Sequence, residues 1–130
     1  MDSAALNEIP LFADLTDRER AAVAASLRGV TVEPGAALAV QGENAYHWFV
    51  IESGSAEVRR DGHVVRTLGP GDVFGEIGLL ATGTRTASVV ATSSMQLAAM
   101  FMREFKHLDA RMPGLGRALR DAMADRPWIS

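Results

Sequence analysis

The chain has 130 residues, a formal net charge of −3 and a hydrophobic fraction of 48%, which is enough for one domain with a substantial core. The absence of cysteine excludes disulfides and thiolate metal sites, and no apolar run approaches the roughly 20 residues that cross a bilayer. The acidic balance argues against non-specific nucleic-acid binding, and the lack of a signal-type N-terminus leads us to expect a cytoplasmic protein.

The N-terminal segment is expected to be helical. Thr16 and Glu19 stand three residues apart, the spacing of a capping box in which each side chain accepts a hydrogen bond from the other residue's backbone N–H. This signal predicts a helix from about Asp17 to Leu27, with Val23 on its buried face.

After Arg28 the sequence changes to short β-branched and apolar runs separated by turn signals. Asp61-Gly62 is a strong signal for a two-residue hairpin. Many short strands at regular spacing favour a β-sandwich or jelly roll. The expected strands are residues 30–32, 37–40, 48–51, 56–60, 64–68, 87–91 and 95–101.

A candidate ligand site follows the turn after the expected strand 64–68. The sequence there is Phe74-Gly75-Glu76-Ile77-Gly78-Leu79-Leu80, followed after a loop by Arg85-Thr86-Ala87-Ser88-Val89. Gly75 and Gly78 lack a Cβ and allow close backbone approach. Residues 77–80 are expected to form one helical turn, whose first N–H groups can face an anion.

The charged residues of this segment suit a ligand with a hydroxyl and a phosphate. The Glu76 carboxylate is only an acceptor of hydrogen bonds, which suits donation from sugar hydroxyls. The Arg85 guanidinium offers a planar fork to a phosphate. The segment therefore predicts a small phosphorylated ligand.

The last third returns to a helical pattern over about residues 102–124. Apolar residues recur there at three- and four-residue spacing, namely Phe105, Leu108, Met112, Leu115, Leu119 and Met123. Pro113-Gly114 interrupts the stripe, which predicts two helices with a break between them.

The run from Phe74 to Val89 resembles the phosphate-binding cassette of cyclic nucleotide-binding domains, the sensor modules of protein kinase A regulatory subunits and the cAMP receptor protein. Every position of the family pattern is filled. The resemblance implies an α+β, mainly β fold, an eight-stranded antiparallel β-roll with an N-terminal helix and C-terminal hinge or lid helices. It implies one domain over residues 1–130, with an N-terminal helical segment at about 3–27, the β-roll at about 28–101 and C-terminal helices at about 102–124. The cassette at residues 74–89 lies within the roll.

The resemblance also implies roles for the cassette residues. Glu76 would accept a hydrogen bond from the ribose 2′-OH, and Arg85 would pair with the cyclic phosphate. The backbone amides of Gly78 and Ala87 would also face the phosphate.

Other residues would surround the ribose and the base. Gly75 and Ile77 would line the ribose side, and Thr86 would lie beside the base. Val58 would form an apolar wall near the base, although ordinary core packing explains it equally well. A lid over the base would come from the C-terminal end, with Trp128, Leu115 and Leu119 as candidates.

The expected function is non-catalytic sensing of a cyclic nucleotide, with cAMP favoured over cGMP and with ligand-driven movement of the C-terminal helices. Scattered His47, His63 and His107 give no metal-ligand spacing, so we expect no metal, no cofactor and no enzyme activity. The alternatives are the sensor fragment of a transcription regulator of the cAMP receptor protein type and a nucleotide-free interaction domain. The expected partner is an unknown effector domain or protein, without membrane or nucleic-acid binding by this chain; the oligomeric state stays open.

Overall fold

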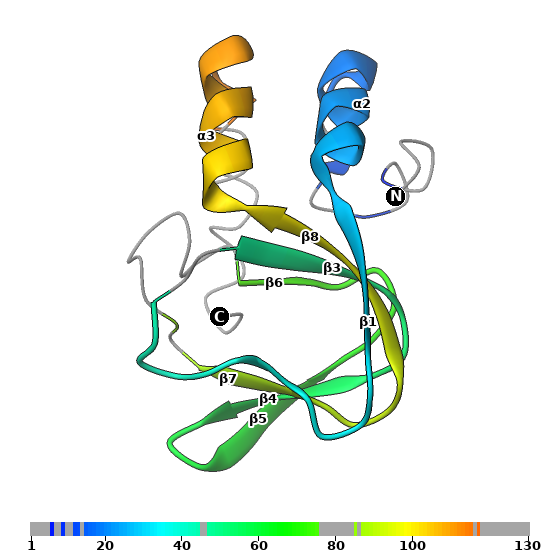
Figure 1. Ribbon diagram of the computed structural model, residues 1–130, viewed down its shortest axis with the longest axis vertical. Coiled ribbons are helices and arrows are strands. Elements are labelled where there is room, and N and C mark those ends of the chain that lie inside the picture. Colours follow the sequence, from blue (N-terminus) through cyan, green and yellow to red (C-terminus); the bar gives the residue numbers. More distant parts are fainter. Residues whose placement is uncertain are drawn as a thin grey trace.

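The computed structural model describes residues 6, 9, 12–13, 15–44, 47–75, 85, 87–115 and 117. Two antiparallel sheets form the body of the molecule, and two helices lie side by side at one end of it (Figure 1). The helices are α2 (Asp17–Ser26) and α3 (Met102–Arg111). The strands are β1 (Arg28–Val32), β2 (Ala37–Ala39), β3 (His47–Ser53), β4 (Ala56–Arg60), β5 (His63–Leu68), β6 (Val73–Phe74), β7 (Ser88–Ala91) and β8 (Met95–Phe101).

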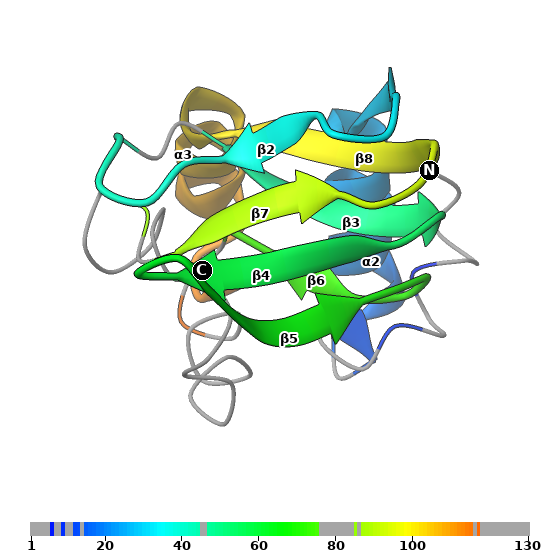
Figure 2. The same cartoon turned by 90° about the horizontal axis from the view of Figure 1, so that it is seen from below.

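Each sheet contains four strands, in the orders β1-β8-β3-β6 and β2-β7-β4-β5. Figure 2 shows the second sheet from its outer side, with the helices behind the first sheet. Strands that neighbour each other in a sheet are mostly distant in sequence, since the chain alternates between the two sheets. This arrangement confirms the expected eight-stranded antiparallel roll.

The first helix begins where the capping box predicted. The Glu19 N–H donates to Thr16 Oγ1 at 3.1 Å, and the Thr16 N–H donates to Glu19 Oε1 at 2.9 Å. Val23 is buried, and the helix ends at Ser26, one residue earlier than expected.

Two apolar clusters fill the fold, one on each face of the β1-β8-β3-β6 sheet. Alternation along β3 sends Trp48 into the cluster under the helices, while Phe49 enters the cluster between the sheets. Trp48 lies against Phe12 with ring centroids 5.7 Å apart, so it packs in the core. Both faces of β3 and β8 are therefore covered, which explains their nearly continuous apolar sequences.

The sequence pattern missed one strand. β6 contains only Val73 and Phe74 and lies between a Gly-Pro-Gly turn and the candidate ligand segment, so it is too short for any periodicity. It forms because the Phe74 ring stacks on Phe49 of β3, with centroids 4.8 Å apart. β4 and β8 have the expected limits, and the other strands differ from the expected limits by one or two residues at an end.

The predicted hairpin turn and the predicted interruption of the C-terminal helical region are both present. Asp61 and Gly62 have φ angles of 53° and 81°, the left-handed backbone that a two-residue hairpin turn with right-handed strand twist requires. After α3, the chain turns at Pro113-Gly114, where Gly114 has a φ of 97°. Among the residues that the structure describes, no helix has the length and apolar character to cross a membrane.

Gly54 should tolerate a side chain poorly. Its φ is +91°, and an added Cβ would collide with the Ser94 carbonyl oxygen and lie 2.8 Å from Met95 Cγ. Gly62→Ala is the matched control, because Gly62 has a φ of +81° with nothing within 4 Å of the added Cβ. We expect Gly62→Ala to cost ~1–2 kcal/mol of unfolding free energy and Gly54→Ala to cost ~1–3 kcal/mol more through overpacking. Urea unfolding measures both, and equal costs would contradict the packing argument.

Candidate functional site

The structure describes four of the eight residues predicted to bind the ligand. Gly75 directly follows β6 and has a φ of +91°, a conformation that glycine adopts without strain. Arg85 and Ala87 lie just before β7, and Val58 lies in β4. The other predicted residues lie outside the described residues, namely Glu76, Ile77, Gly78 and Thr86 and the lid candidates Leu119 and Trp128.

Arg85 is the buried charged residue of this region, with only 4% of its surface exposed. Its Nη1 donates to the Gly75 carbonyl oxygen at 3.1 Å. Its backbone N–H donates to the Glu43 carbonyl oxygen at 2.8 Å, and its own carbonyl oxygen accepts from the Gly42 N–H at 2.9 Å. These bonds join three segments that are distant in sequence. The guanidinium thus reaches the end of β6, and its pairing with a cyclic phosphate stays a prediction.

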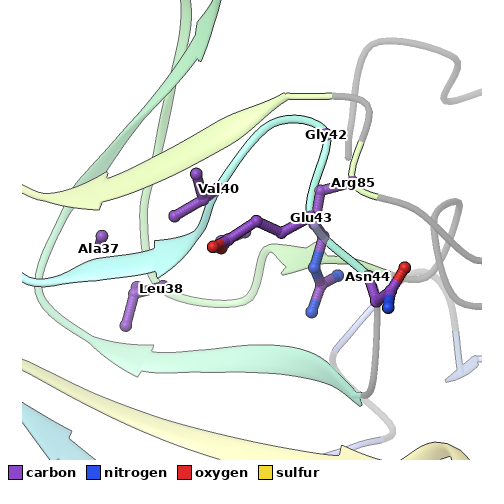
Figure 3. A pocket seen from close by; sticks show the side chains of 8 residues that line it. Ala37, Leu38, Val40, Gly42, Glu43, Asn44 and Arg85 are labelled. Carbon is purple, nitrogen blue, oxygen red and sulfur yellow. The ribbon is translucent and has the colours of Figure 1, made fainter.

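A cavity of about 540 Å³ lies beside Arg85. Its size falls within the range of ~300–1,000 Å³ that small-molecule sites occupy. Figure 3 shows the Arg85 guanidinium on the side of Asn44, while the Glu43 carboxylate extends along β2, away from the guanidinium. The described lining consists of Ala37, Leu38, Ala39, Val40, Gly42, Glu43, Asn44 and Arg85.

The cavity wall formed by β2 and residues 42–44 was not foreseen. Gly42 follows the expected strand 37–40 and has a φ of +86°. Four strands separate this turn from Arg85 along the sequence, so no local spacing could have indicated their contact. A turn glycine after a short apolar strand was the available signal.

Val58 and Ala87 are fully buried in the cluster between the two sheets. Neither belongs to the described lining of the cavity. The core-packing explanation of Val58 therefore holds in the structure, and its contact with a base stays a prediction. Leu115 is likewise buried, but in the cluster under the helices, which is separate from that of Val58.

The register of the β4–β5 hairpin places a second arginine near Val58. Ala56 pairs with Leu68 and Val58 pairs with Arg66, and directly opposed residues point to the same face of a sheet. Since Ala56, Val58 and Leu68 are buried between the sheets, Arg66 lies on that inner face although it is exposed. The register shift that follows Val58 hid this placement from the sequence pattern.

Comparisons with known proteins agree with this geometry. The model of the cyclic nucleotide-binding domain family matches residues 29–111. A cAMP-dependent protein kinase regulatory subunit of Yarrowia lipolytica is 39% identical over 105 residues, covering 79% of this chain and 28% of the relative. The regulatory subunit of Schizosaccharomyces pombe is 34% identical, covering 94% of this chain and 28% of the relative. The chain thus spans about a quarter of the length of these relatives.

Solved structures show the same architecture. The N-terminal domain of a transcriptional regulator from Streptomyces coelicolor has a TM-score of 0.79 at 30% identity, covering 94% of this chain and 91% of that one. The regulatory domain of Toxoplasma gondii PKA with cAMP has a TM-score of 0.80 at 26% identity, covering 95% and 48%. The family match runs from β1 through α3 and includes the Arg85 segment, so this chain belongs to the cyclic nucleotide-binding domain family.

Proposed function

We propose that this chain is a non-catalytic regulatory domain that binds a cyclic nucleotide, with cAMP as the first candidate. The observation that carries the proposal is the buried Arg85 beside a ligand-sized cavity, within the chain segment where the family pattern has its phosphate-binding arginine. The related Toxoplasma domain was crystallised with cAMP, which supports the choice of ligand.

The cyclic phosphate would lie against the Arg85 guanidinium. A buried cation needs acceptors or an anion to offset the loss of hydration, and a charge-assisted bond contributes ~1.5–3 kcal/mol. Glu76 would hold the ribose 2′-OH, with Gly75 and Ile77 beside the sugar. The Gly78 and Ala87 amides would complete the phosphate contacts.

The base would lie toward the hairpin side, near Val58 and Thr86. A lid from the C-terminal end would cover it, and the candidates stay Trp128, Leu115 and Leu119. The proposed domain comprises residues 1–130, with the roll at 28–101 between the helical segments 3–27 and 102–124.

Ligand binding would act through the C-terminal helices. α3 begins at Met102, directly after the last residue of β8, so a shift at the end of the roll reaches the helix without an intervening loop. The turn at Pro113-Gly114 is a suitable hinge. The ligand must bind one helix arrangement better than the other, and a tenfold preference corresponds to ~1.4 kcal/mol. The output would be an effector domain or protein, in a cytoplasmic setting.

The second candidate ligand is cGMP, and the position of Arg66 favours it. Guanine presents two acceptors, O6 and N7, that a guanidinium can bind in a bidentate manner, whereas adenine has a donor amino group at the corresponding edge. Arg66 shares the inner face with Val58, where the base is proposed to lie. A guanidinium there would therefore favour guanine.

Titration calorimetry with cAMP and cGMP tests the proposal directly. We expect saturable binding of at least one nucleotide with 1:1 stoichiometry, because the proposed site binds one phosphate through Arg85. Absence of binding of both at high micromolar concentration would refute the proposed function.

Arg85→Ala should weaken binding by roughly ten- to a hundredfold, because one charge-assisted phosphate contact is lost. Arg85→Lys should recover only part of this loss, since an ammonium group lacks the planar fork. Arg103→Ala on the exposed face of α3 is the control for the loss of one positive charge. Circular dichroism checks that each variant folds. Unchanged affinity in folded Arg85→Ala would contradict the phosphate role.

Arg66→Ala tests the preference between the two nucleotides. If Arg66 contacts guanine, cGMP affinity should fall by ~1–3 kcal/mol, while cAMP affinity stays within about twofold. Arg60→Ala, the next inward-facing position toward the hairpin tip, controls for the change in local charge. Equal losses for both nucleotides would exclude base recognition by Arg66.

A further inference from the structure

The tip of the β4–β5 hairpin extends beyond the sheet that supports it. The pairing of β4 with β7 ends at Arg59 and Ser88, because Ser88 is the first residue of β7. The hairpin continues through the Asp61-Gly62 turn to the closing pair of Arg60 and His63. The ladder to β7 therefore does not hold the tip in place.

The side chain of Gln41 holds the tip instead. Its Nε2 donates to Asp61 Oδ1 at 2.9 Å, and its Oε1 accepts from the Asp61 N–H at 2.9 Å. The backbone N–H of Gln41 donates to Ser88 Oγ at 2.9 Å. Gln41 thus contacts both Ser88, the first residue of β7, and the hairpin turn that extends past it.

Gln41 is also adjacent to the turn that holds Arg85. The next residue, Gly42, donates its N–H to the Arg85 carbonyl oxygen at 2.9 Å, and the Arg85 N–H donates to Glu43 at 2.8 Å. Hydrogen bonds therefore link Asp61 to Gln41, and further hydrogen bonds link the two residues that follow Gln41 in the chain to the backbone of Arg85. Gly42 and Glu43 also line the cavity.

We propose that Gln41 is a positioning residue that holds the β4–β5 hairpin and the Arg85 segment in one fixed relation. The inference rests on the proposed cyclic-nucleotide function, because these two segments would meet the base and the phosphate of one ligand. A ligand that bridges them binds best when their separation is set before binding, since less ordering is then required. Nucleotide affinity thus depends on an exposed glutamine that does not contact the ligand and acts through the two segments that it holds.

Two substitutions at Gln41 separate hydrogen bonding from charge. Gln41→Leu removes both side-chain bonds at similar volume and equal charge. The double variant Q41E/D61N also keeps the net charge of the wild type, and it reverses the direction of the side-chain bond, with an Asn amide donating to a Glu carboxylate. Asn tolerates the left-handed backbone of position 61. Gln96→Leu, at an exposed position of β8, is the matched control.

Calorimetry should show that Gln41→Leu binds the preferred nucleotide roughly five- to tenfold more weakly, because two exposed hydrogen bonds to Asp61 are lost, one of them to its carboxylate. Q41E/D61N should return to within about twofold of wild type, and Gln96→Leu should not differ. In amide hydrogen exchange, the nucleotide should slow exchange at the hairpin tip in wild type and in the double variant, but less in Gln41→Leu.

The outcomes distinguish this inference from the proposed function. A wild-type chain that binds neither nucleotide refutes the function and the role of Gln41 together. Wild-type binding that Gln41→Leu leaves unchanged refutes the positioning role alone. A weakened Gln41→Leu that Q41E/D61N does not restore shows that the side-chain bond to Asp61 is not the cause, and this also overturns the inference.

Discussion

The burial of one guanidinium imposes the main constraint on the ligand-binding side of this molecule. Arg85 is almost completely enclosed, and a buried cation is tolerated only where acceptors replace its hydration. The Gly75 carbonyl oxygen meets the side chain at 3.1 Å, and the turn at residues 42–43 holds the backbone on both sides. The end of β6, the turn after β2 and the start of β7 must therefore stay together, and the cavity lies beside Arg85, along β2 and the turn that follows it.

The sheet β1-β8-β3-β6 connects this region to the helices. Along β8, Leu97 and Ala99 face the cluster between the sheets, while Ala98 and Met100 face the cluster under the helices. α2 and α3 pack on the outer side of this sheet (Figure 1), and the Arg28 guanidinium lies 4.8 Å from the centre of the Phe101 ring, where β8 passes into α3. A displacement inside the roll can thus reach α3 through a single strand with apolar contacts on both faces.

The Arg85 segment and the tip of the β4–β5 hairpin have different mechanical support. The Arg85 side is fixed by backbone hydrogen bonds and burial, whereas the hairpin tip depends on the side chain of Gln41 and its two bonds to Asp61. Both bonds are exposed to solvent, and a typical intramolecular hydrogen bond contributes only ~0.5–1.5 kcal/mol. Of these two segments, the hairpin tip is therefore the one that a ligand can more easily order, and the Arg85 segment is the fixed reference against which it is ordered.

Local signals in the sequence determined the elements of this protein, because a cap, a turn or a strand limit depends on residues only a few positions apart. Thr16 with Glu19 began a helix, Asp61-Gly62 closed a hairpin, and the Phe74–Val89 pattern indicated the family. Only the tertiary structure decided which distant residues meet. β6 exists through the stacking of Phe74 on Phe49, and Arg66 lies beside Val58 through a shifted register. The pairings of Arg85 with residues 42–43 and of Gln41 with Asp61 likewise depend on how strands from distant parts of the chain align, which no local spacing specifies.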